Sequence, residues 1–328
     1  MRSILALLSL AVFATLAWGG YWFVGAGALD RSVAQALQDN GQFDAADHRV
    51  RGFPNRFDLT LDQPRLTAPG LAWQAPFVQV FALTYRPHHV IVVFANDQRF
   101  DLGGETALLH SADLRASVVA APRLSLALER SALVAELPEV SVAGQTHRAD
   151  ALRLASRALA PERHEMVIEI ENGFPDAGLM NALDPGAHWP RRFDVLRLEG
   201  EALFDRPLDR EALQGRTPAL AGLALTGGRI AWREGDVTID LRATGRLEAD
   251  SAGRLSGPLT LEVTQWRALM RRARDAGMMP ADHAQLAEMA LESMVDPENP
   301  DQLEVALQLR GGDILLGPVV LGSLPPLF

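Results

Sequence analysis

Residues 229–241 read RIAWREGDVTIDL, and this stretch decides the fold class. Apolar and polar side chains alternate on both sides of its Glu-Gly-Asp turn at 234–236. Alternation with a period of two is typical of a strand that has one buried face and one solvent-exposed face. Two such runs joined by a short turn that contains glycine predict an antiparallel hairpin.

The same alternation recurs in both directions along the chain. It is found in further runs at residues 57–61, 124–128, 166–170, 259–263 and 303–309. Short strands at regular spacing, separated by turns, are typical of an antiparallel meander. We therefore predict a mainly β (α+β) fold built on a curved antiparallel sheet.

One region near the C-terminus follows a helical period instead. Trp266, Leu269 and Met270 recur at helical spacing within residues 264–277, and Pro280 begins a second helical stretch that ends near residue 295. This predicts a helical insert that carries four arginines: Arg267, Arg271, Arg272 and Arg274. The arginines could contact anionic lipid headgroups, and an ordinary solvated helix face is the alternative.

A faint repeat relates two parts of the chain. FPNRFDL at 53–59 and WPRRFDV at 189–195 share Pro, Arg, Phe and Asp at matching positions. The repeat allows two similar halves, 30–170 and 171–328, within one domain that covers residues 30–328. In the first copy, Arg56 and Asp58 lie two residues apart on a strand, so they would share a face and could pair. We favour this structural interpretation over a recognition site.

The N-terminus carries an uncharged apolar run from residue 3 to residue 29. A spanning helix needs about 20 such residues, and Arg2 before the run orients the N-terminus toward the cytoplasm. Trp18, Tyr21 and Trp22 suit the lipid–water boundary at the outer end. We predict a transmembrane anchor at residues 1–29, followed by a short helix at 30–41. A cleaved signal peptide with Ala26-Gly27-Ala28 as its site is the alternative, although its apolar core would be shorter, roughly 7–15 residues.

The composition excludes several kinds of chemistry. The chain has no Cys and no Lys, and all 31 basic residues are Arg. Disulfides, thiolate metal sites, Schiff bases and P-loop lysines are therefore impossible. The net charge of −10 argues against a nucleic-acid partner. The histidines show no metal-ligand spacing, and no G-x-S-x-G motif occurs. We predict a protein that is not an enzyme and has no cofactor, metal or catalytic residue.

Four strings carry a resemblance to a known family. They are GFPNRFDL at 52–59, WQAP at 73–76, YRPH at 85–88, and the ending at 317–326. The chain resembles a domain-of-unknown-function family of alphaproteobacterial envelope proteins that have one N-terminal anchor. Residues 225–232 and 247–259 also resemble, more loosely, AsmA-like proteins. That resemblance implies an elongated β-groove that shelters acyl chains, although this chain is shorter than the large AsmA-like members.

Two functions remain open. In the first, the chain is a single-pass protein of a bacterial inner membrane whose periplasmic sheet shelters or transfers membrane lipid in an apolar groove. In the second, the same apolar residues pack a closed core, and the protein is an envelope scaffold or an assembly partner of other envelope proteins without a ligand. An open apolar surface would favour the first function, and a filled interior would favour the second.

Overall fold

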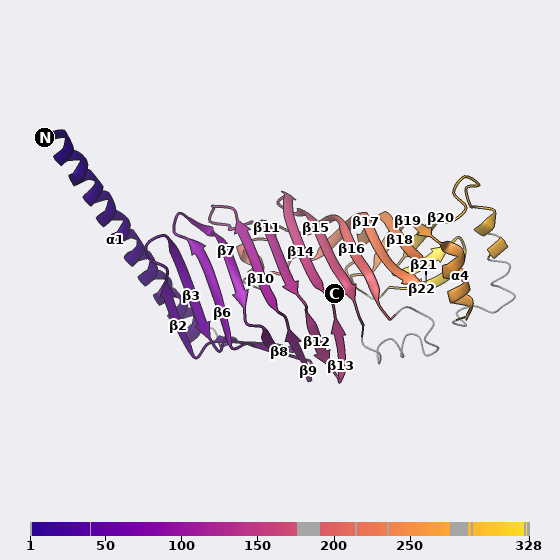
Figure 1. Cartoon of the computed structure of the whole chain (residues 1–328), viewed down its shortest axis with the longest axis horizontal. Coiled ribbons are helices and arrows are strands. Elements are labelled where there is room, and N and C mark those ends of the chain that lie inside the picture. The colour runs from indigo at the N-terminus through magenta and orange to yellow at the C-terminus, as the bar shows by residue number, and fades with distance from the viewer. Residues whose placement is uncertain are drawn as a thin grey trace.

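A computed structural model describes residues 2–39, 41–175, 191–213, 215–234, 236–275, 288–289, 291–324 and 326. The described chain is mainly β, with two large antiparallel sheets and a long helix that protrudes from one end (Figure 1). The mainly β fold predicted from the alternation is confirmed.

The protruding helix is α1, Arg2–Asp39. Its side chains in the first half are exposed and apolar, as Leu7 and Phe13 illustrate at 67% and 70% exposure. The segment Leu7–Asp39 is long and apolar enough to cross a membrane, which is consistent with single-pass anchoring. The short helix expected after residue 29 is the continuation of α1 without a break.

Seven long strands follow, and each is bent into two parts. The two parts are, in chain order, β1 Phe43–Asp44 and β2 Asp47–Arg51, β3 Arg56–Asp62 and β4 Arg65–Ala68, β5 Leu71–Gln74 and β6 Phe77–Leu83, β7 Arg86–Phe94 and β8 Asp97–Leu102, β9 Glu105–His110 and β10 Asp113–Ala120, β11 Leu128–Glu136 and β12 Glu139–Val142, and β13 Gln145–Arg148 and β14 Ala151–Ala160. One part of each joins a seven-stranded sheet in the order β1-β4-β5-β8-β9-β12-β13. The other part joins a fifteen-stranded sheet.

The bends form a single line, which we call the crease. Each bend is two residues long and contains Ala or Pro, at 45–46, 63–64, 75–76, 95–96, 111–112, 137–138 and 149–150. Proline has no N–H to donate to a neighbouring strand, and alanine is small enough to be buried where two sheets meet. Hydrogen bonds such as Gln63 N–H to the Pro76 oxygen (2.9 Å) hold adjacent bends together. The two sheets are therefore two walls that meet at the crease.

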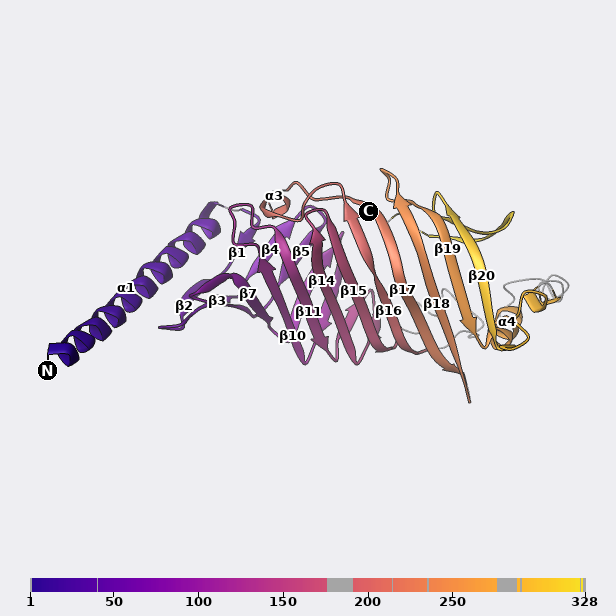
Figure 2. The same cartoon turned by 90° about the horizontal axis from the view of Figure 1, so that it is seen from above.

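The large sheet continues beyond the small one. Its further strands are β15 Arg163–Gly173, β16 Phe193–Phe204, β17 Leu220–Glu234, β18 Val237–Ala249, β19 Leu255–Thr264, β20 Gln302–Arg310, β21 Asp313–Leu316 and β22 Val319–Ser323. They extend the order β2-β3-β6-β7-β10-β11-β14 strand by strand (Figure 2). When each bent strand is counted as one, every strand pairs with the strand before it and the strand after it, so the described chain is a meander, as predicted. The predicted halves would meet inside β15, and their similarity stays a prediction.

Two short helices complete the described fold: α3, Arg210–Leu213, and α4, Trp266–Asp275. Helix α4 confirms the helical pattern at 264–277. Most of the second helical stretch, from 280 to 295, lies outside the described residues.

One predicted strand is wrong. The run at 124–128 alternates Leu with smaller residues, yet residues 121–127 form a loop and β11 begins only at Leu128. Pro122 offers no N–H to a neighbouring strand, and Leu126 has a positive φ of 50° and donates its N–H to the Arg123 oxygen within the loop. Leu124 is consequently 92% exposed.

Candidate functional site

The large sheet has one apolar face and one polar face. The strand register places Leu133 opposite Leu154, and Leu154 opposite Ile168, so aliphatic side chains continue from strand to strand on one side. We call this side the apolar face. Its representatives from β3 to β20 are Leu59, Val80, Val92, Val118, Leu133, Leu154, Ile168, Leu198, Ile230, Leu241, Leu261 and Val305.

The small sheet turns its own apolar side toward this face. Trp73 of β5 contacts Phe94 of β7 edge to face, with ring centroids 6.4 Å apart. The Trp73 indole N–H donates to the buried side-chain oxygen of Gln98 at 2.9 Å, which fixes the ring near the crease. The apolar face is thus bounded on one side by a second apolar wall.

The middle of the apolar face is not a closed core. Val118 and Leu198 remain 39% and 41% exposed, and Leu133, Leu154 and Ile168 are only half-buried. These side chains therefore present apolar surface that no other layer of the described chain fully covers.

Helix α1 covers the first end of the apolar face. The Trp22 indole N–H donates to the Arg56 carbonyl oxygen at 2.7 Å, and its ring stacks on Phe57 with centroids 6.3 Å apart. Gly25 lies so close to the Phe57 ring that a Cβ there would be 2.7 Å from it. The anchor and the apolar face are therefore joined directly, without a linker.

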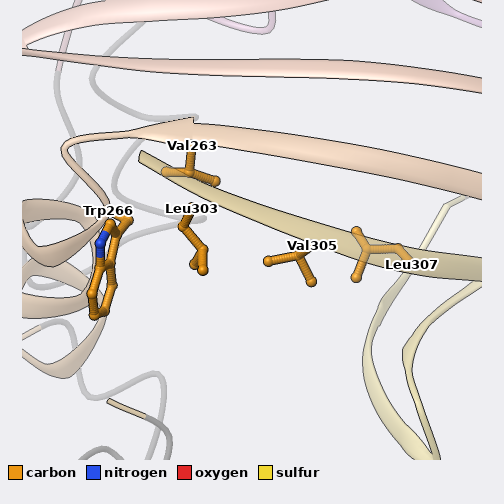
Figure 3. Packing of buried hydrophobic residues seen from close by; sticks show 5 residues of the cluster. All are labelled: Val263, Trp266, Leu303, Val305 and Leu307. Carbon is orange, nitrogen blue, oxygen red and sulfur yellow. The ribbon is translucent and has the colours of Figure 1, made fainter. Parts of the chain in front are cut away.

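Helix α4 covers the opposite end. Trp266 is 1% exposed and packs with Leu303, Val305 and Leu307, whose side chains project from β20 in a row toward it (Figure 3). The Trp266 indole N–H donates to the Pro300 carbonyl oxygen at 3.1 Å. This end is the best-packed part of the described molecule.

The polar face carries charges in pairs across neighbouring strands. Arg153 pairs with Glu169 at 3.1 Å, and Arg197 approaches the same carboxylate at 2.7 Å. The hydrogen bond from Arg197 is the main reason that the pKa of Glu169 is lowered, and Arg153 adds to it. Arg56 also pairs with Asp58 at 2.8 Å, as predicted from their spacing. Exposed pairs of this kind contribute little stability each, and they keep this face in water.

Two cavities are lined by charged and apolar side chains together. One of about 580 Å³ lies at the crease, among residues that include Arg65, Gln74 and His110. Another of about 470 Å³ lies among Arg130, Arg157 and other residues of β7 to β15. An alkyl chain would find a better match on the open apolar face than in either cavity.

His164 is the exception among the side chains of the apolar face. It lies opposite Ala202, is 1% exposed, and has its ring edge to face with Phe204 at 6.1 Å. Its Nδ1 has no hydrogen-bond partner among the described residues. Burial lowers the pKa of His164, so the imidazole is neutral near pH 7 and compatible with apolar surroundings.

The four arginines considered for headgroup contact lie on α4. The guanidinium of Arg267 is engaged by neighbouring side chains, because it pairs with Glu292 at 2.5 Å and stacks over Trp266. Arg271 and Arg274 are exposed, whereas Arg272 is partly buried. Helices α4 and α1 lie at opposite ends of the molecule (Figure 1). Headgroup contact by Arg267, Arg271, Arg272 and Arg274 stays a prediction.

No group of three or more metal-ligating side chains occurs among the described residues. The buried polar groups Thr84 and Ser111 are satisfied by backbone oxygens, so they serve the fold. The geometry of the site is therefore that of a surface for apolar contact.

The family comparison matches nearly the whole chain. Residues 22–325 match the family described as "Uncharacterized protein conserved in bacteria (DUF2125)". The chain belongs to the DUF2125 family. The DUF2125 match begins at Trp22, the residue that joins α1 to β3, and includes the crease and α4. No curated protein and no solved structure matches the chain.

Sequence reasoning missed the two joints that define the site. Trp22, Gly25 and Ala26 were assigned to the lipid-facing anchor, yet Trp22 and Ala26 are buried against the sheet. A large side chain beside small ones on one side of a helix is the signal that could have indicated packing there. The crease had no distinct signal, because Ala and Pro at bends such as 63–64 and 75–76 are also common in ordinary turns.

Proposed function

We propose that this DUF2125 protein shelters the acyl chains of membrane lipid on its apolar face, without a catalytic step. The observation that carries the proposal is the continuous apolar face that stays partly exposed in its middle, at Val118 and Leu198. Contiguous apolar surface on a protein usually marks an interaction site, because exposing it to water is unfavourable.

The position of the anchor supports lipid over other apolar ligands. The middle of helix α1 packs against the first strands of the apolar face, through Trp22 and Phe57. Arg2 before the apolar run favours a cytoplasmic N-terminus, so we place the sheet in the periplasm, next to the inner membrane. The looser resemblance of residues 225–259 to AsmA-like proteins points the same way.

An envelope scaffold is the alternative, in which another protein covers the apolar face. The two functions differ in what occupies this face after gentle purification. Full-length protein extracted in a mild detergent is therefore analysed by mass spectrometry of its organic extract. We expect phospholipid or another acyl lipid in a fixed ratio to protein. Protein without lipid after such preparation would favour the scaffold.

A matched pair of variants locates the lipid. Leu198 lies on the apolar face of β16 and is 41% exposed, whereas Leu203 of the same strand lies on the polar face and is 46% exposed. We expect Leu198→Glu to lose most of the bound lipid, because a carboxylate cannot be desolvated beside an alkyl chain without a large cost. Leu203→Glu should retain it. Equal retention by both variants would show that the lipid is bound elsewhere, for example around α1.

A further inference from the structure

The edge of the large sheet opposite the crease carries exposed apolar side chains. We call this edge the rim. Its first three turns are residues 52–55, 84–85 and 121–127. They carry Phe53, Tyr85, Leu124 and Leu126, which are 55%, 60%, 92% and 45% exposed. Single exposed apolar residues are common, but here they occupy three successive turns along one edge.

Helix α1 fixes the level of two of these turns relative to a bilayer. The Trp18 indole N–H donates to the Pro54 oxygen at 3.0 Å, and the Tyr21 hydroxyl donates to the Thr84 oxygen at 2.8 Å. Tryptophan and tyrosine at the end of a spanning helix lie at the lipid–water boundary. Both turns are bonded to these side chains, so they lie at the same boundary.

One further contact and the spacing of the strands strengthen this placement. Phe53 stacks on Phe23 of α1 with centroids 5.6 Å apart, and Phe23 is itself 66% exposed. The third turn follows four strands after the first, which places it about 20 Å along the rim. The exposed apolar row thus begins at the anchor and continues away from it.

The charges beside the three turns suit an anionic surface. Arg51, Arg86 and Arg123 are exposed and form no ion pair within the described part of the chain. Residues 51–56, 84–88 and 121–127 contain no Asp or Glu, although the whole chain has a net charge of −10. The segment bonded to the third turn, through Arg210 N–H to the Ser125 oxygen at 2.9 Å, adds Asp209 next to Arg210, and its Glu211 is paired with Arg216 at 2.7 Å. Arginine binds phosphate oxygens well, and apolar side chains flanked by arginine are typical of membrane-surface contacts.

We infer that the rim from β2 to β11 rests on the bilayer that α1 crosses, with Phe53, Tyr85 and Leu124 among the lipid headgroups. The partner is the phospholipid surface, and the contact holds whether or not the apolar face carries lipid. The domain is then held by a spanning helix and by a peripheral edge, which fixes its orientation and prevents it from swinging about α1.

The absence of cysteine allows a direct measurement of depth. Leu124→Cys and, as a matched control, Leu102→Cys are labelled with a fluorophore in the otherwise cysteine-free full-length chain. Leu102 ends β8 on the small sheet and is 48% exposed. Both proteins are reconstituted into vesicles of phosphatidylcholine and phosphatidylglycerol, and quenching by nitroxide-labelled lipid is compared with quenching by a soluble agent.

We expect lipid-borne nitroxide to quench the label at 124 several-fold more than the label at 102, and the soluble agent to show the reverse order. Equal quenching at both positions would overturn the inference. Protection of position 124 from the soluble agent without quenching by lipid would also overturn it, because a second protein copy would then cover the rim. Leu124 is almost fully exposed, so its replacement leaves the fold intact.

Discussion

The two ends of the apolar face are each covered by a helix that contributes a tryptophan, but they are built differently. At the α4 end, Trp266 is 1% exposed within a cluster of aliphatic side chains from β19 and β20. At the α1 end, Trp22 is 7% exposed and contacts mainly the rings of Phe53 and Phe57. Both indoles donate a hydrogen bond to a backbone oxygen. The α4 end is a packed core, whereas the α1 end is a joint between a long apolar helix and a sheet.

This difference indicates which parts of the domain contribute most to its stability. The middle of the apolar face contributes little close packing, because its side chains are half-exposed. The domain must therefore depend on the α4 end and on the crease, where Pro64, Ala95 and Ser111 are buried. The α1 end fixes the position of the sheet relative to helix α1.

The largest effect is expected from removing the α4 tryptophan. Trp266→Ala should lower the free energy of unfolding by about 3–5 kcal/mol, because it leaves a large cavity in the best-packed cluster. Trp22→Ala should lower it by about 1–3 kcal/mol. Urea denaturation of the full-length chain in detergent measures both. Equal losses would mean that the two ends are packed alike.

The joint itself can be broken with a matched pair of glycine variants. Gly25→Val places a Cβ 2.7 Å from the Phe57 ring, whereas Gly27→Val meets no atom within 4 Å. Both changes have the same effect on helix propensity, so their difference reports the contact with β3. We expect Gly25→Val to destabilise the joint by about 1–3 kcal/mol through overpacking.

Limited proteolysis after residue 39 measures the effect of this pair in reconstituted protein. Cleavage should become faster in the Gly25 variant and stay unchanged in the Gly27 variant. If both variants are cleaved alike, α1 is not held against the sheet through Phe57.

A smaller effect is expected at His164, between the two ends. Its pKa in the folded protein is lowered by burial, so the unfolded chain takes up a proton more readily. Wild-type stability is therefore fully present above about pH 6.5 and falls as the pH decreases below that value. His164→Leu should remove this part of the pH dependence. The free energy of unfolding of the variant should therefore rise relative to that of wild type as the pH is lowered from 7 to 5. A constant difference across this range, measured by urea denaturation, would contradict the assignment.

The smallest effect is expected on the outer side of α4. Arg271→Gln combined with Arg274→Gln should change the free energy of unfolding by no more than about 0.5 kcal/mol, because both side chains are exposed. A larger loss would show that the packed end also depends on these charges. The same variant, floated with vesicles that contain phosphatidylglycerol, tests the predicted headgroup contact.

Much of the fold could be predicted because its signals are local. The alternation at 166–170 and 237–241 is set by neighbouring side chains, and it specifies strands without any knowledge of their partners. The helical spacing of Trp266, Leu269 and Met270 indicated α4 for the same reason. The loop at 121–127 could not be separated from a strand in this way, because its leucines alternate too and only Pro122 marks the difference.

The open state of the apolar face could not be predicted. The strands of Leu133 and Leu154 show the same alternation whether or not a second layer packs on them. Alternation indicates that one face of a strand is apolar, but it does not indicate what covers that face. The crease was equally hidden, since Gln63-Pro64 and Ala75-Pro76 read as ordinary turns. Only the register of neighbouring strands brings these bends into one line.

The sequential pairing of the strands gives the fold an adjustable length. Among the described strands none depends on a distant strand for its partner, so an extra hairpin could be inserted between two neighbours without changing the pairing of the others. Each inserted pair of strands would lengthen the apolar face by about 10 Å, and each deleted pair would shorten it equally. The length of the apolar face in a chain of this design can therefore change by the addition or removal of hairpins, while α1 and α4 continue to cover its two ends.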